Sequence, residues 1–96
     1  MEIEFHPEAV KEIREATLYY QAQQTGLGER FLSTVQESLT RISNFPESFP
    51  IVVGNVRQCK VARFPYALVY RSQVNYIQVI ALAHSRRKPQ YWSSRS

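Results

Sequence analysis

The feature that most constrains this chain is a change of hydrophobic period near residue 50. Before that point, apolar residues recur at the three- and four-residue spacing of a helix face. After it, short β-branched and aromatic runs alternate with turn residues. A helical half followed by a strand half predicts an α+β domain, in which a helical hairpin packs on one face of a small antiparallel sheet. The 96 residues are enough for one such domain over residues 1–96, with its own core.

Two helices are predicted in the first half. Pro7 suits the first turn of a helix that runs from residue 8 to about residue 24. Gly26 and Gly28 then bracket a tight turn, and Pro46 ends the second helix. Because the turn is so short, the helices should form an antiparallel hairpin. Their apolar stripes are Val10, Ile13, Thr17 and Tyr20 in the first helix, and Phe31, Val35, Leu39 and Ile42 in the second.

Four strands are predicted, in the order β-α-α-β-β-β. EIEF at the N-terminus forms the first, and RQCKVAR, ALVYR and YIQVIALA form the others. The short links between the last three favour an antiparallel meander. The stretch FPESFPIVVGN, with two prolines and a Gly-Asn turn, is interpreted as a connector without a strand.

The last predicted strand is apolar on both of its faces. Strict alternation would place Ile77, Val79, Ala81 and Ala83 on one face, and Ile80, Leu82 and His84 on the other. The two helices can cover only one face of the sheet. We therefore expect a partner or the C-terminal tail to cover the second face.

Charge is distributed unevenly along the chain. Residues 1–48 hold all eight acids and four bases, whereas residues 49–96 hold eight bases and no acid. This asymmetry predicts an anionic partner, either nucleic acid or an acidic protein segment. A single cysteine fits a reducing, cytoplasmic location, and the N-terminus lacks the pattern of a signal peptide. No apolar run approaches the ~18 residues of a membrane span, and we expect neither a metal nor another cofactor.

The segment AHSRRKPQYW, at the end of the last strand, contains several residues that could take part in catalysis or in binding. RNA cleavage by 2′-OH attack needs a base, and His84 is the best candidate because no carboxylate side chain follows Glu47. Tyr91 or Trp92 could stack on an unpaired base. Six further side chains could bind phosphate. These are Arg57, Lys60, Arg63, Arg71, Arg86 and Arg87.

The same residues also have structural interpretations. A histidine at a strand end commonly bonds to nearby backbone, so His84 need not be catalytic. At least one of Arg86 and Arg87 could pair with a glutamate of the first helix. Tyr91 and Trp92 could pack over the open sheet face, because so much apolar area is costly to leave in water.

The element order, the segment ARFPYALVYR and the ending VIALAHSRRKPQYW resemble the RelE/ParE superfamily of toxins from type II toxin–antitoxin systems. The resemblance runs from EIEFHPEAV to Trp92, nearly the whole chain. It implies a small cytoplasmic toxin that a cognate antitoxin, small, acidic and encoded beside it, holds inactive. ParE-like members inhibit DNA gyrase, whereas RelE-like members cut messenger RNA on the ribosome.

FPYALVYR and AHSRRKPQYW favour the ParE-like, plasmid-stabilisation branch, with gyrase as the target. The alternative is a RelE-like, ribosome-dependent endonuclease, in which His84, Arg87 and Tyr91 would be catalytic. RelE-like ribonucleases typically carry several basic residues on the inner strands, and Lys60 is the one lysine there. The residues expected to bind the target or the antitoxin are Arg57, Lys60, Arg63, Arg71, Arg86, Arg87 and Trp92.

Overall fold

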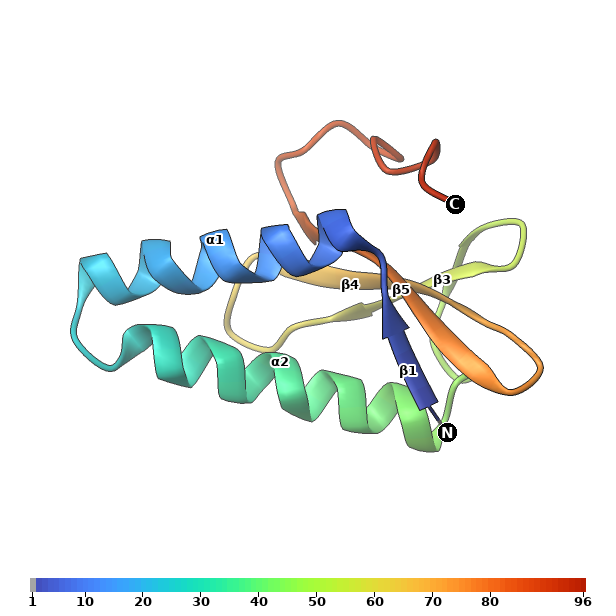
Figure 1. The fold of residues 1–96 in the computed structure, drawn as a ribbon, viewed down its shortest axis with the longest axis horizontal. Helices are drawn as coiled ribbons and strands as arrows, with labels where there is room; N and C mark the ends of the chain where they lie inside the picture. The colour runs from blue at the N-terminus through green and yellow to red at the C-terminus, as the bar shows by residue number, and fades with distance from the viewer. Residues whose placement is uncertain (1) are drawn as a thin grey trace.

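The computed structural model describes residues 2–96 and arranges them as a helical hairpin against a five-stranded sheet (Figure 1). Within the sheet the strands follow the order β1-β5-β4-β3-β2. The α+β class and the hairpin predicted from the sequence are confirmed. In chain order the elements are β1 (Glu2–Phe5), α1 (Pro7–Gln23), α2 (Leu27–Asn44), β2 (Ile51–Val53), β3 (Val56–Lys60), β4 (Tyr66–Ser72) and β5 (Tyr76–His84).

Local sequence sets the hairpin's start and its turn. His6 caps α1, since its Nδ1 accepts a hydrogen bond from the backbone N–H of Glu8 at 3.0 Å. The turn passes through Gly26 at φ 88°, a left-handed conformation that favours glycine. Gly28 is buried where the helices meet, and a Cβ there would lie 2.7 Å from the carbonyl oxygen of Thr17. The two helices can therefore approach closely only with glycine at this position.

The main core lies between the hairpin and the sheet. Phe31 and Leu68 are fully buried there, in a cluster that also holds the inward stripe of α2. The ring of Phe31 packs against those of Tyr20 and Phe64, with centroids 5.1 and 5.0 Å away. The buried Tyr70 donates a hydrogen bond to the carbonyl of Pro46 at 2.6 Å, which ties the connector after α2 to the sheet.

The sheet is mixed, which refines the predicted antiparallel arrangement. Strands β3, β4 and β5 pair antiparallel, as expected, and β2 pairs antiparallel to β3, but β1 pairs parallel to β5. Parallel neighbours need a long crossover, and the helical hairpin and the following strands supply the intervening chain. The interpretation of FPESFPIVVGN as strand-free was wrong, because Ile51–Val53 forms the short edge strand β2 against β3.

A β-bulge in β5 overturns the predicted alternation of its faces. Tyr70 pairs with Val79 and Val69 pairs with Ala81, so Ile80 is an extra residue opposite β4. Ile77 and Val79 join the helix-side core, whereas Ile80 and Ala81 both belong to a second cluster on the other side. The bulge thus makes one strand apolar on both faces without a strict period of two.

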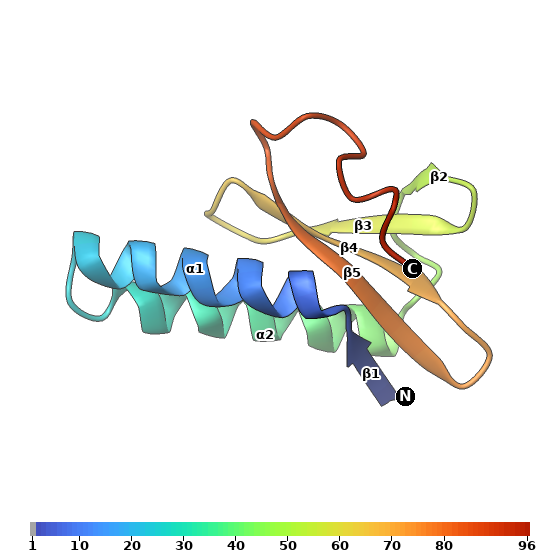
Figure 2. The same cartoon turned by 45° about the horizontal axis from the view of Figure 1, so that its top comes forward.

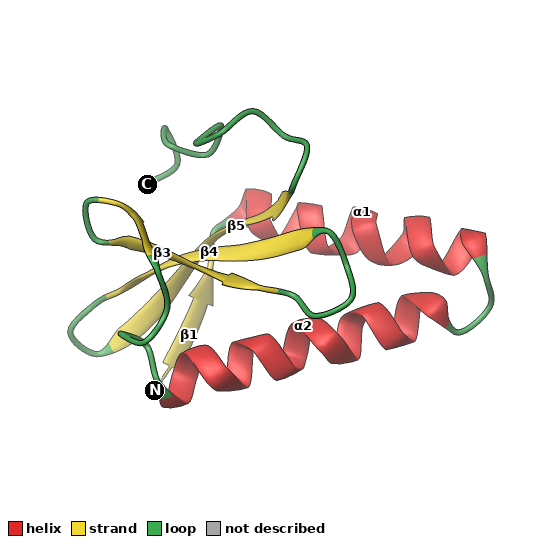
Figure 3. Ribbon diagram, turned by 180° about the vertical axis from the view of Figure 1, so that it is seen from behind, coloured by secondary structure: helices red, strands yellow, loops and turns green. Residues whose placement is uncertain are grey.

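The C-terminal tail, residues 85–96, crosses the second face of the sheet (Figure 2). Seen from behind, the tail and α2 lie on opposite sides of the sheet (Figure 3). Trp92 is only 5% exposed and packs with Val56, Val69, Ile80 and Ala81. The tail itself therefore covers the face that the sequence analysis left open.

Candidate functional site

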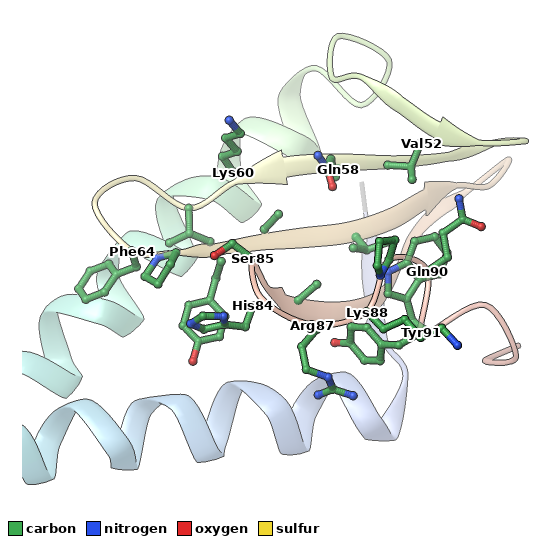
Figure 4. A pocket seen from close by; sticks show the side chains of 18 residues that line it. Val52, Gln58, Lys60, Phe64, His84, Ser85, Arg87, Lys88, Gln90 and Tyr91 are labelled. Atoms are coloured by element: carbon green, nitrogen blue, oxygen red, sulfur yellow. The ribbon is translucent and has the colours of Figure 1, made fainter.

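A hollow of about 530 Å³ opens between the ends of β3, β4 and β5 and the tail (Figure 4). We call it the basic hollow. Lys60 lies on one side of it, on β3, and Arg87 and Tyr91 lie on the other (Figure 4). No acidic side chain is among the described residues that line it. Its lining therefore carries positive charge without compensation inside the hollow. The lysine, arginine and histidine residues that line it are Lys60, His84, Arg87 and Lys88.

His84 is held at the end of β5 by local hydrogen bonds. Its Nδ1 accepts from the backbone N–H of Arg86 at 3.0 Å, and its carbonyl accepts from the N–H of Arg87 at 3.0 Å. Its ring meets the ring of Tyr66 edge-on, with centroids 4.9 Å apart. Nδ1 of His84 is therefore engaged in a local hydrogen bond with the backbone. This is the structural interpretation that the sequence raised for a strand-end histidine.

The side chain of Tyr91 is also held by hydrogen bonds. Its hydroxyl oxygen lies 2.7 Å from Oε2 of Glu12 and 3.3 Å from the carbonyl oxygen of Leu82. Burial and the hydrogen bond to the Glu12 carboxylate raise the pKa of this phenol far above its ordinary value. The guanidinium carbon of Arg87 lies 3.7 Å from the centroid of the Tyr91 ring, a cation–π contact. Tyr91 therefore positions Arg87 and is a poor proton donor.

Glu12 of α1 is the residue that sequence reasoning missed. Its Oε1 accepts from the N–H of Leu82 at 3.0 Å, and its two oxygens receive the guanidinium fork of Arg95 at 2.9 and 2.8 Å. Burial alone would raise the Glu12 pKa, but the hydrogen bonds from Arg95, Tyr91 and Leu82 outweigh it, so the pKa is lowered. The first-helix glutamate expected to pair with Arg86 or Arg87 pairs with Arg95 instead.

The remaining predicted site residues do not all meet at the basic hollow. Arg57 turns to the connector after α2, where it donates to the carbonyls of Glu47 and Phe49 at 3.1 and 2.8 Å. Arg71 lies across from Gln78, outside the hollow lining. Arg63, in the turn after β3, and Arg86, in the tail, are exposed beside it. The hollow therefore unites Lys60, His84, Arg87, Tyr91 and Trp92 among the predicted residues.

A second hollow, of about 410 Å³, lies along the helical hairpin and is lined by different residues from the basic hollow. We call it the hairpin groove. Leu18 is 62% exposed there, and Val10 and Leu32 are 38% and 37% exposed. Within residues 2–96, Arg14 is the one charged residue that lines it. Exposed apolar side chains gathered in this way mark a surface suited to a protein partner. The lining consists of Phe5, Val10, Ile13, Arg14, Thr17, Leu18 and Leu32.

No helix among residues 2–96 is both long and apolar enough to cross a membrane. Within the same residues, no group of three or more His, Cys, Asp or Glu side chains could hold a metal ion.

The β-α-α-β-β-β-β arrangement, with its helical hairpin, mixed sheet and basic hollow, is a toxin fold of the RelE/ParE type. A family model described as the ParE toxin of the type II toxin–antitoxin system parDE matches residues 3–89. The chain belongs to this ParE toxin family, which confirms the resemblance noted in the sequence.

Among solved structures, the chain is similar to one from the chromosomal ParDE TA system of P. aeruginosa. The TM-score is 0.63 at 18% identity, over 88% of this chain and 95% of that one. At this identity the likeness bears on the fold alone. No curated protein matches the sequence.

Proposed function

We propose that this ParE-family toxin acts by binding DNA gyrase in the cytoplasm, and that it does not cleave RNA. The observation that carries the proposal is the engagement of its candidate proton-transfer groups. Tyr91 is bonded to Glu12, and Nδ1 of His84 accepts from backbone. A general acid–base pair needs groups that are free to exchange protons with the substrate.

The ribonuclease alternative is further weakened at Trp92. This tail side chain is packed against the sheet and only 5% exposed, so it offers no face on which a nucleobase could stack. The charged groups that remain accessible at the hollow are all cationic among the described residues: Lys60, Arg87 and Lys88 are exposed. Such groups favour binding to an anionic surface through long-range attraction and charge-assisted hydrogen bonds.

The same proposal places the antitoxin on the hairpin groove. The sheet face that could have received an antitoxin is already covered by Trp92, whereas Leu18 and Val10 remain exposed. An amphipathic helix of an acidic antitoxin fits such a groove, with its apolar face against Leu18 and an acidic side chain at Arg14. The target and the antitoxin would then use two different surfaces of the toxin.

Expression of this chain in bacterial cells without an antitoxin tests the proposal. We expect growth arrest with filamentation, a DNA-damage response and altered plasmid supercoiling, while messenger RNA stays intact. Co-expression of the small acidic reading frame next to the gene should restore growth. Growth arrest with cleaved messages and normal supercoiling would instead establish the RelE-like endonuclease.

A further inference from the structure

Strand β5 continues past the end of its neighbour β1. The two strands pair only as far as Phe5 and Val79, and the N–H of His6 then bonds to the carbonyl of Val79 at 2.9 Å. Beyond this point, no strand of the described part of the chain lies beside the outer backbone edge of β5. An unpaired edge needs other hydrogen-bond partners, because buried backbone groups are costly to leave unsatisfied.

Side chains provide those partners. The N–H of Leu82 bonds to Glu12, and the carbonyl of Ile80 accepts from Nη1 of Arg95 at 3.1 Å. The Tyr91 hydroxyl lies near the carbonyl of Leu82 as well. Helix α1 and the C-terminal tail thus complete the edge of β5 together. The carboxylate of Glu12 contacts the strand and both tail residues, Tyr91 and Arg95.

We infer that Glu12 is a positioning residue whose carboxylate latches the C-terminal tail onto β5 and so builds one wall of the basic hollow. The functional half of this inference rests on the proposed function, in which that hollow binds gyrase. The chain of contacts runs from Glu12 to Tyr91, and from the Tyr91 ring to Arg87, which lines the hollow. Glu12 itself does not line it.

The tail depends on this latch because it has few other anchors. Residues 85–90 are all exposed. Apart from the burial of Trp92, two further polar contacts join the tail to the rest of the domain. The N–H of Ser85 donates to the carbonyl of Pro65 at 2.8 Å, and Nε2 of Gln78 donates to the carbonyl of Ser96 at 3.1 Å. The Glu12 and Arg95 side chains are each only 13% exposed. Removing one charge of such a pair leaves the other poorly solvated, which is more damaging than losing a surface ion pair.

The test uses the fact that Trp92 is the only tryptophan, so tryptophan fluorescence reports how the tail packs on the sheet, and circular dichroism separates this from global unfolding. Glu12→Gln removes the charge but keeps a side-chain oxygen for the N–H of Leu82. Glu15→Gln is the matched control, because Glu15 is an exposed glutamate on the same helix. In Glu12→Gln we expect red-shifted Trp92 emission and stronger acrylamide quenching, while the far-UV circular dichroism is retained. Gyrase inhibition should fall roughly tenfold or more, as expected for a lost charged hydrogen bond.

Arg95→Gln and Arg95→Lys test the other end of the latch. Arg95→Gln should reproduce the Trp92 changes even if Glu12→Gln fails to fold. Arg95→Lys keeps the charge, so its Trp92 signal should lie closer to that of wild type. An unchanged Trp92 signal in folded Glu12→Gln and Arg95→Gln would overturn the latch. A released tail with full growth arrest in cells would overturn its role in building the hollow.

The gyrase target can be wrong even if Glu12 does position the tail. If wild-type protein leaves gyrase fully active but still arrests growth, the target is wrong. Trp92 fluorescence and growth arrest would then still decide whether Glu12 positions the toxic surface.

Discussion

The two faces of the sheet are covered in different ways. On one face the hairpin packs a continuous apolar interior, with Phe31, Val35 and Ile42 at 0–1% exposure. On the other face a short tail lies over a smaller cluster and is held by Trp92, by the Glu12 carboxylate and by a few hydrogen bonds to backbone and side chains of the sheet. Apolar packing of the first kind stabilises a whole domain, whereas a few polar contacts of the second kind hold one segment in place. The hairpin therefore maintains the fold, and the tail shapes the basic hollow.

The largest effect should come from the hairpin side of this comparison. Phe31→Ala deletes a fully buried ring in contact with Tyr20 and Phe64, and should lower the free energy of unfolding by about 3–5 kcal/mol. Chemical denaturation followed by circular dichroism and by Trp92 fluorescence should show both signals lost together. Ser33→Ala, at an exposed position of the same helix, is the control and should change little. A Phe31→Ala protein that loses only its Trp92 signal would contradict the division between the two faces.

The outer surface of the hairpin should matter for the antitoxin alone. Leu18→Glu places a charge in the hairpin groove and should weaken antitoxin binding by about 2 kcal/mol, roughly 30-fold. Gln23→Glu adds the same charge at an exposed position of α1 outside the groove, and should bind like wild type. Calorimetric titration with the purified antitoxin provides the measurement. If both variants bind like wild type, the antitoxin docks elsewhere.

Acid should release the tail before it unfolds the hairpin. The Glu12 pKa lies below its ordinary value of 4.5, so its stabilising contribution is fully present above about that pH and is lost as the pH falls through the lowered value. The titratable groups that face the Glu12 carboxylate are Tyr91 and Arg95. Arg87 lies over the Tyr91 ring, and the negative charge of Glu8 helps to raise the Arg95 pKa.

A pH titration of Trp92 emission, with circular dichroism in parallel, tests this order of events. We expect the Trp92 emission to shift in acid while the helical circular dichroism signal persists. Protonation of Glu12 should lower the local stability of the tail by about 1–3 kcal/mol. Glu12→Gln should abolish that pH dependence. Coincident loss of both signals in wild-type protein would show that the tail and the hairpin unfold as one unit.

The smallest effect is expected at His84. Its Nδ1 accepts from the Arg86 N–H, and the side-chain oxygen of glutamine can take over that role. His84→Gln should therefore remain as toxic as wild type, within about twofold, because under the proposed function the imidazole has no proton to move. A catalytic histidine would instead contribute roughly 10²–10⁴-fold. A folded, harmless His84→Gln that no longer cleaves messages would favour the endonuclease.

Sequence reasoning found the parts of the fold that depend on local patterns. The stripe of Phe31, Val35 and Ile42 predicted the hairpin core because helical spacing is a local signal. Strand β2 was missed because three residues between a proline and a Gly-Asn turn carry too little pattern. The bulge at Ile80 was missed because apolar residues on both sides of it fit either alternation.

The candidate site was only partly predictable. His84, Arg87 and Tyr91 lie within one short segment, so their proximity could be inferred. Glu12 and Arg95 are separated by 83 residues and meet only because β5 runs past β1. No local pattern marks that encounter, and the asymmetry of charge pointed only to the basic half of the chain.

The most direct test of the central proposal is supercoiling of relaxed plasmid by purified DNA gyrase in the presence of this toxin. We predict that wild-type protein blocks supercoiling, and that Lys60→Gln combined with Arg87→Gln weakens this inhibition at least tenfold while the fold is retained. Arg30→Gln, which removes a positive charge from an exposed site on α2, should inhibit like wild type. Full gyrase activity at saturating wild-type toxin, together with message cleavage on translating ribosomes, would contradict the account.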